Sequence, residues 1–258
     1  MKIGVCAPPH YWQAAKEAGY DHVEWNFSIV ATYTEEQMKE YLALKDSLGL
    51  LVPSFNGFFP GGFLMFDTDR AAVEAKARDY AKGGFEKAAR FGADVAVMGS
   101  GYARNVPEGM DLAEAKERFA SLMHILGEEG EKVGVRVAIE PLRKQETNFI
   151  HTLWEGAEIC DMVGHANVGL TFDIFHFWSG GEPMENIEKY KKHVFHAHIA
   201  RPQADRLAPT AADTEDCLVY RDALRAIGYD DKISLEPVYS RDFVGDIMGA
   251  YPVLEKFR

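Results

Sequence analysis

The stretches VRVAIE at 135–140 and VGLTFD at 168–173 decide the fold of this chain. Side chains on a β-strand point to opposite faces with a period of two. In the first stretch, Val137 and Ile139 share an apolar face, and Glu140 ends the opposite face behind a small alanine. An apolar face that can pack on helices, opposite a small or polar face that ends in an acid, is typical of a (β/α) barrel strand near the catalytic mouth.

Two further runs, VFHAHI at 194–199 and ISLE at 233–236, repeat this alternation. In the first, we expect Phe195 on the apolar face and His198 on the polar face, while Glu236 ends the second run. Four consecutive strand candidates therefore each deliver one side chain that can bind a metal near the carboxyl end. Because the carboxyl ends of parallel barrel strands meet at one mouth, we expect these side chains to lie together.

Units of this kind recur along the whole chain, each with an amphipathic stretch, a glycine suited to a helix C-cap and a short strand-like run. The strand candidates are residues 2–7, 21–26, 50–56, 93–99, 135–140, 168–173, 194–199 and 233–236. Eight alternating strand and helix units predict an α/β fold, specifically a single (β/α)₈ TIM barrel, with residues 1–258 forming one domain. Capping-box spacing marks three helix starts, at Thr34 with Gln37, Asp111 with Glu114 and Thr152 with Glu155.

Composition limits the partners and the compartment. The chain has 28 basic and 40 acidic residues, a net charge of −12, which opposes binding to nucleic acid. Its three cysteines are widely separated and lack a C-x-x-C spacing, so we expect reduced thiols and a cytoplasmic location. No run approaches the length of a membrane span, and we expect no membrane partner.

The four strand-end residues have the chemistry of a metal site. Glu140, Asp173, His198 and Glu236 combine three anionic carboxylates with one imidazole. This donor set suits Mn²⁺, our first choice, as well as Mg²⁺ and Co²⁺, and it can also hold Zn²⁺. Any one of the three acids could be a solvated or salt-bridged group, but four metal-type residues on successive strands and on one face predict a single divalent-metal site.

The chain resembles the xylose isomerase-like superfamily of TIM barrels, and within it the ketose 3-epimerases of the D-tagatose and D-psicose type and the hydroxypyruvate isomerases. The resemblance covers nearly the whole length and is carried by four motifs, EPLRKQET at 140–147, TFDIFH at 171–176, HAHI at 196–199 and ISLEP at 233–237. It implies metal binding by the four residues above, proton transfer by Glu140 and Glu236, and substrate contacts from Glu146 and His176.

The implied reaction is proton transfer on a small ketose or related hydroxy-ketone through a metal-stabilised enediolate. One glutamate would remove a proton and the other would return one to the opposite face, which gives C3 epimerisation. Return to the neighbouring carbon would give aldose–ketose isomerisation, as in a hydroxypyruvate isomerase. Loss of a hydroxide after the same proton abstraction would make the protein a lyase like inosose dehydratase. The resemblance also implies a homo-oligomer, a dimer or a tetramer.

The loop after the metal-binding histidine departs from the epimerase pattern. Those enzymes carry an arginine six residues after that histidine, and this chain has Ala204 there. Arg201 and Arg206 flank the position, and we expect one of them to contact the substrate. A solvated loop arginine is the alternative for each.

Other residues leave two interpretations open. Trp12, Phe55, Phe58 and Phe59 could form an apolar wall over a sugar or pack in the core. His196 could support His198 or be an ordinary hydrogen-bonded core histidine. Glu24 could line the mouth or lie on the surface.

Two other functions fit a barrel of this kind. A DNA hydrolase resembling endonuclease IV would need more histidines at its strand ends and a positive surface, whereas strands two to four here end in EWN, SFN and MGS. A non-catalytic barrel subunit would retain three clustered carboxylates that repel one another in the absence of a cation. The sequence therefore favours a metal-dependent isomerase.

Overall fold

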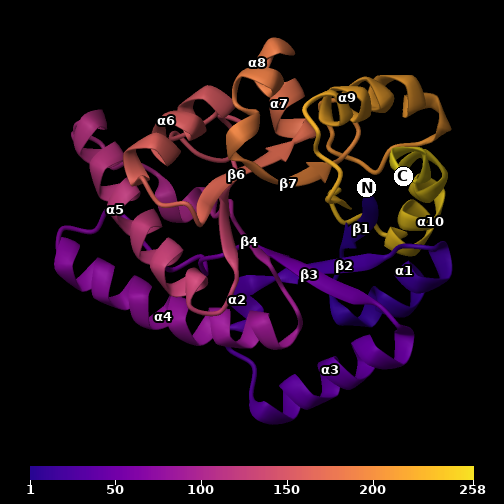
Figure 1. Ribbon diagram of the computed structural model, residues 1–258, viewed down its shortest axis with the longest axis horizontal. Coiled ribbons are helices and arrows are strands. Elements are labelled where there is room, and N and C mark those ends of the chain that lie inside the picture. Colours follow the sequence, from indigo (N-terminus) through magenta and orange to yellow (C-terminus); the bar gives the residue numbers. More distant parts are fainter.

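The computed structural model describes residues 1–258 and contains eight parallel strands that close into a barrel in sequence order (Figure 1). The strands are β1 (Lys2–Cys6), β2 (His22–Asn26), β3 (Leu51–Asn56), β4 (Val95–Met98), β5 (Arg136–Ile139), β6 (Val168–Asp173), β7 (Val194–Ile199) and β8 (Lys232–Leu235). Strand β1 pairs with β2 on one side and β8 on the other, which closes the sheet. The predicted single (β/α)₈ barrel is confirmed.

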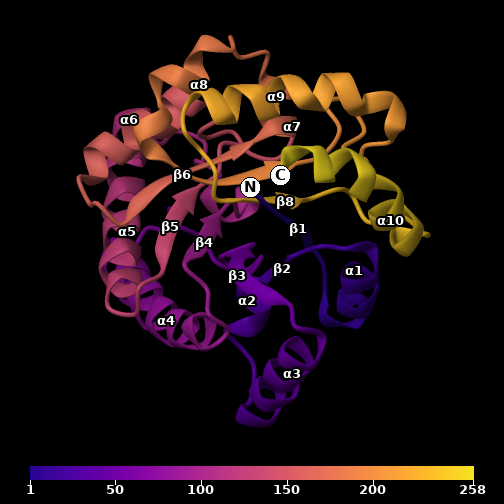
Figure 2. The same ribbon diagram turned by 45° about the vertical axis from the view of Figure 1, so that its right-hand side comes forward.

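Helices surround the barrel, as Figure 2 shows. They are α1 (Trp12–Ala18), α2 (Phe27–Val30), α3 (Glu35–Leu48), α4 (Arg70–Arg90), α5 (Leu112–Glu131), α6 (Leu153–Val163), α7 (Ile174–Gly180), α8 (Glu185–Lys189), α9 (Thr214–Ala226) and α10 (Phe243–Leu254). Short 3₁₀ turns are η1 (Pro9–Tyr11), η2 (Gly101–Arg104), η3 (Lys191–His193), η4 (Ala211–Asp213) and η5 (Glu255–Phe257). The short helices α2 and α8 are additions to the eight predicted helical stretches. None of the helices combines the length and apolarity needed to cross a membrane.

Two of the three predicted capping boxes form in full. Thr34 caps α3 and Thr152 caps α6, and in each the backbone N–H of the threonine donates back to the side chain of the third helical residue. Asp111 also caps its helix, α5, by accepting from the N–H groups of Ala113 and Glu114. The caps therefore fix the residue at which each of these helices begins.

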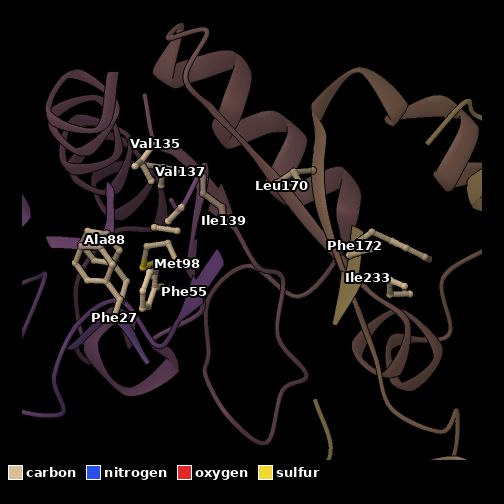
Figure 3. Close-up of a cluster of buried hydrophobic side chains, with 14 of the residues drawn as sticks. Phe27, Phe55, Ala88, Met98, Val135, Val137, Ile139, Leu170, Phe172 and Ile233 are labelled. Carbon is tan, nitrogen blue, oxygen red and sulfur yellow. The ribbon is translucent and has the colours of Figure 1, made fainter. Parts of the chain in front are cut away.

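The main hydrophobic core lies between the outer face of the barrel and the helices. Val135, Val137 and Ile139 belong to this core, as the alternation predicted, and Figure 3 shows them alongside other buried side chains. A separate apolar cluster of Val95, Val97 and Ala138 fills part of the barrel interior. The outward core supplies the hydrophobic stabilisation, so other interior positions are free to be polar.

The predicted position of Phe195 is wrong. The pairing of β6 with β7 shifts register between Leu170 and Thr171, which leaves Phe195 without a partner on β6. Its ring packs against the interior cluster instead of sharing the outer face with Ala197 and Ile199. A β-bulge inserts one residue and disrupts the alternation locally, which a strict period of two does not anticipate.

Three residues other than glycine have a positive φ, and all three lie in loops that follow barrel strands at the same end. They are Ser100 after β4, with φ 39°, Ile150 after β5, with φ 62°, and Arg206 after β7, with φ 52°. For a β-branched residue such as Ile150 this conformation is strained. Backbone strain of this kind tends to gather where a protein does its chemistry.

Candidate metal and substrate site

The four predicted ligands meet at the carboxyl end of the barrel. One ligand atom from each of Glu140, Asp173, His198 and Glu236 lies within 4.8 Å of the other three. His198 Nδ1 lies 3.0 Å from Glu140 Oε1, 3.2 Å from Glu236 Oε2 and 3.9 Å from Asp173 Oδ2. Glu140 and Glu236 directly follow the last residues of β5 and β8, so both carboxylates stand at the rim of the barrel.

Glu24 holds the other side of the histidine ring. His198 Nε2 donates to Glu24 Oε1 across 3.0 Å, because a carboxylate can only accept. This bond turns Nδ1 toward the carboxylates of the cluster. A carboxylate behind a ligating histidine is the usual arrangement that fixes its tautomer and orientation in metal sites.

The second oxygen of Glu24 collects three more donors inside the barrel. Glu24 Oε2 accepts from Ser54 Oγ at 2.7 Å, Ser234 Oγ at 2.8 Å and His196 Nε2 at 2.8 Å. Glu24 is fully buried, so neither the mouth nor the surface interpretation is right: it lies one layer below the mouth. His196 acts on His198 through this shared carboxylate.

The cluster favours a positive charge at His198 Nδ1. Burial opposes protonation of His198, but the charges of Glu24 and Glu236 outweigh it and raise the pKa of the imidazole well above its usual value. Burial likewise opposes ionisation of Glu24, yet the two histidines hold its pKa well below the usual range. In the metal-free protein, a proton on His198 therefore provides the positive charge that offsets the surrounding carboxylates.

The two candidate acid/base glutamates differ in their electrostatics. Burial, followed by the charge of Glu236, raises the pKa of Glu140 to about 7. Burial also acts on Glu236, but His198 and Arg206 outweigh it and lower the pKa of that carboxyl to about 2. Two carboxylates whose environments push their pKa values apart are a common arrangement for acid and base roles.

The donor set fits a divalent cation. Three carboxylates and one oriented imidazole nitrogen converge on one point. In the metal-free protein, burial and then repulsion by Glu236 raise the pKa of Glu140. A cation at this point would offset that repulsion and replace the proton on His198. Hard oxygen donors with one imidazole suit Mn²⁺, Mg²⁺ or Co²⁺, and Zn²⁺ also accepts such ligands.

Both oxygens of Glu236 are held by neighbouring side chains. Asn56 Nδ2, at the end of β3, donates to Oε1 across 2.7 Å, and Arg206 Nη2 donates to Oε2 across 2.5 Å. Sequence reasoning missed Asn56, although it ends its strand as the metal ligands do. Applying the same strand-end rule to the SFN motif would have found it.

Asp173 and His176 lie together at the start of α7. Asp173 Oδ1 accepts from the backbone N–H of His176 across 2.9 Å, which caps the helix. His176 Nδ1 accepts from the backbone N–H of Arg143 at 3.3 Å, so its proton resides on Nε2. Nε2 is buried and has no partner in the protein. His176 therefore keeps a free donor beside the metal-type cluster.

A small polar cavity of about 200 Å³ opens beside the cluster. It is lined by Asn26, Asn56, Gly57, Gly99, Ser100, Gly101, Glu140, Leu142, Glu146, Arg206 and Glu236. Of the predicted substrate contacts, Glu146 and Arg206 line this cavity. His176 and Arg201 do not line it, and Arg201 forms an ion pair with Asp205 in the same loop. The structure therefore separates the two arginines that the sequence could not.

Glycine at position 99 leaves room for the Glu140 carboxylate. A Cβ at Gly99 would lie 2.5 Å from Glu140 Oε2, closer than carbon and oxygen can approach. The carboxylate therefore occupies space directly above the end of β4. A residue without a Cβ directly after β4 therefore leaves the Glu140 carboxylate in place.

The aromatic residues near the mouth belong to the core. Trp12, Phe55, Phe58 and Phe59 are all buried, and none of them lines the cavity. Phe58 stacks on Phe27, with ring centroids 4.2 Å apart. The core interpretation of these four side chains is thus the right one.

Comparisons with known proteins place the chain in a family. Residues 12–251 match the family model described as the xylose isomerase-like TIM barrel. A provisionally named hydroxypyruvate isomerase of Danio rerio is 28% identical over 214 residues, which are 75% of this chain and 71% of that protein. An inosose isomerase of Bacillus velezensis is 29% identical over 133 residues, 48% of this chain. The match spans 47%, or about half, of that isomerase.

Solved structures share the fold across the whole chain. The D-allulose 3-epimerase of Methylomonas sp. in complex with D-allulose superimposes with a TM-score of 0.83 at 17% identity, covering 100% of this chain and 97% of that one. The 3-keto-D-glucoside 4-epimerase of E. coli gives a TM-score of 0.82 at 18% identity, covering 100% and 99%. With the family model covering most of its length, this chain belongs to the xylose isomerase-like TIM barrel family.

Proposed function

We propose that this protein is a divalent-metal-dependent sugar epimerase or isomerase that moves a proton on a small ketose or related hydroxy-ketone. The observation that carries the proposal is the convergence of three carboxylates and one imidazole within 4.8 Å, beside a small polar cavity. The metal ligands would be Glu140, Asp173, His198 and Glu236. A bound divalent cation would act as a Lewis acid that polarises the oxygens next to the reacting carbon.

Glu140 and Glu236 are the proposed acid/base pair. Both line the cavity, so both can reach a substrate bound there. Glu140 follows the end of β5 and faces the cavity, so its carboxylate can exchange a proton with a substrate held there. Asn56 and Arg206 hold Glu236 in one orientation, so its free movement is limited while it faces the substrate.

Three side chains are the proposed substrate contacts. The unpartnered Nε2–H of His176, beside the metal-type cluster, can donate to a sugar oxygen. Glu146, which lines the cavity, can accept from a hydroxyl. We assign the arginine contact to Arg206, since Arg206 lines the cavity and Arg201 does not. An Arg206→Met variant should raise KM, and an Arg201→Met variant should leave it near the parent value.

The stereochemical outcome depends on where the proton returns. Return to the same carbon from the opposite face gives our first choice, epimerisation at C3. Return to the neighbouring carbon gives an isomerase, and the printed names of the sequence relatives, inosose isomerase and hydroxypyruvate isomerase, favour keeping that candidate. Their partial coverage makes each of these activities a proposal for this chain.

The test is incubation of the Mn²⁺-loaded protein in deuterated water with ketoses, hydroxypyruvate and inososes. Deuterium at C3 indicates epimerisation, deuterium at the neighbouring carbon indicates isomerisation, and loss of water indicates a lyase. Glu140→Gln and Glu236→Gln should each lower exchange by about a thousandfold or more. The matched control is Glu158→Gln, which changes a surface glutamate paired with Lys116. Exchange that persists in either active-site variant refutes the assigned pair.

The identity of the metal can be tested separately. Titration of the metal-free protein with Mn²⁺, Mg²⁺, Co²⁺ and Zn²⁺ should show one site, and Asp173→Asn should weaken it. We expect Mn²⁺ to support the fastest exchange. Equal exchange rates in metal-free and metal-loaded protein would contradict the metal dependence.

A further inference from the structure

Arg104 is a buried arginine at the edge of the site that the proposed reaction does not use. It ends the turn η2 just after β4 and has 0% of its surface exposed. Its guanidinium contacts main-chain oxygens only. Nη2 donates to Glu140 O at 2.8 Å and to Ile150 O at 3.4 Å, and Nη1 donates to Met98 O at 3.5 Å.

Burying the guanidinium of Arg104 in this way costs more free energy than burying an apolar side chain would. Burying a guanidinium without a carboxylate partner carries a large desolvation penalty. Nε of Arg104 has no hydrogen-bond partner at all. An apolar side chain of similar length could fill the same space without that penalty. The hydrogen bonds to three carbonyl oxygens are therefore what arginine provides at this position and an apolar side chain does not.

The carbonyls that Arg104 contacts mark both ends of one loop. Glu140 begins the loop and Ile150 closes it, with Leu142 N–H donating to Ile150 O across 3.1 Å. Ile150 has the strained φ of 62°. The loop carries Glu146 into the cavity, and Glu140 stands at its base. One guanidinium thus joins the start and the end of the loop to the end of β4.

We propose that Arg104 is a positioning residue, which holds the main chain of Glu140 and closes the 140–150 loop so that Glu140 and Glu146 face the cavity. The inference rests on the proposed function, because it assigns Arg104 to the metal and substrate site described there. Arg104 acts through the backbone and contacts neither the metal ligand atoms nor the substrate. Loss of its hydrogen bonds should release the strained Ile150 and loosen the base of Glu140.

The test compares Arg104→Met with a matched arginine elsewhere. Arg118 is also buried, donates to the main-chain oxygen of Asp67 and has an unpartnered Nε, but it lies on α5. Mn²⁺ affinity is measured by calorimetry, and amide hydrogen exchange is followed in peptides covering 141–150. Neither measurement needs a known substrate. Arg104→Met should weaken Mn²⁺ binding by about tenfold or more and speed exchange of the loop, whereas Arg118→Met should change neither.

Arg104→Lys keeps the inference testable if Arg104→Met does not fold. A lysine retains the charge but cannot span three carbonyls with a fixed fork, so Mn²⁺ affinity should fall measurably in a folded protein. Parent-like Mn²⁺ affinity and parent-like loop exchange in a folded Arg104 variant overturn the inference, as does equal loss in Arg118→Met. Failure of the parent protein to bind Mn²⁺ would instead refute the metal site itself.

Discussion

The two faces of strand β6 differ in what they contribute to the protein. Phe172 points outward and packs edge-on against Phe177, with ring centroids 5.2 Å apart, in the core between barrel and helices. Asp173, the next residue, points to the mouth and faces His198 and Arg206. Adjacent residues thus serve separate purposes, because the pleat of the strand sends them to opposite faces.

The barrel accommodates a site that is costly in stability by separating these two faces. Buried carboxylates and histidines reduce stability unless every group has a partner. The outer core supplies hydrophobic stabilisation without occupying the mouth, and the interior supplies partners such as Glu24 and Asn56. Substitutions on the outer face should therefore change the free energy of unfolding, and substitutions on the inner face should change metal binding.

The largest expected effect is on the outer face. Phe172→Ala should lower the free energy of unfolding by about 3–5 kcal/mol, because it removes a fully buried ring and leaves a cavity. The Mn²⁺ affinity of the folded variant should stay near the parent value. Denaturant titration and calorimetry measure the two quantities.

Asp173→Asn is the matched inner-face variant for that experiment. It should weaken Mn²⁺ binding far more than Phe172→Ala does, with a smaller loss of stability. If Phe172→Ala weakens Mn²⁺ binding as much as Asp173→Asn, the two faces are not functionally separate.

Removal of Mn²⁺ should have the next largest effect on the free energy of unfolding. Mn²⁺ binds the assembled cluster and not the unfolded chain, so free Mn²⁺ at a hundred times its Kd should stabilise the protein by about 2.7 kcal/mol. For a domain of this size that corresponds to a rise in Tm of about 5–10 °C. Thermal unfolding with and without a chelator measures it. In Asp173→Asn the same addition of Mn²⁺ should raise Tm much less.

Glu24→Gln should have a smaller but specific effect. Loss of the carboxylate behind His198 should weaken Mn²⁺ binding about 10- to 100-fold, or about 1.4–2.7 kcal/mol. Ser54→Ala is the control, since it removes one donor to Glu24 and leaves the bond to His198 intact. Equal Mn²⁺ affinity in Glu24→Gln and the parent would show that His198 is oriented without this carboxylate.

The sequence predicted the parts of the site that depend on local pattern. The eight strands and the convergence of the four metal-type residues follow from alternation along each strand and from the geometry of a barrel. The role of Glu24 could not be predicted in this way, because its partners come from β3, β7 and β8 and meet only inside the closed barrel. Phe195 was misplaced because a bulge is set by pairing between strands. Arg104 was missed because main-chain acceptors leave no trace in residue types.

His22 gives the smallest expected effect and extends the comparison to the deeper interior. It lies below Glu24 and donates from Nε2 to Ser234 Oγ across 3.0 Å, because the hydroxyl proton of Ser234 goes to Glu24, and its Nδ1 has no partner. Burial lowers the pKa of His22 from 6.5 to about 3, so the folded protein keeps it neutral. The unfolded chain takes up a proton below its ordinary pKa, so this contribution to stability is complete above pH 6.5 and declines between 6.5 and about 3.

His22→Gln removes this proton uptake on unfolding. Between pH 6 and pH 4, the loss of unfolding free energy per pH unit should therefore be smaller than in the parent by about 1.4 kcal/mol. Denaturant titrations at several pH values measure the slope, and His10→Gln, which changes an exposed histidine, is the control. If the slopes of His22→Gln and the parent agree, His22 takes up its proton in the folded protein as well. The polar interior of the barrel would then extend as deep as His22.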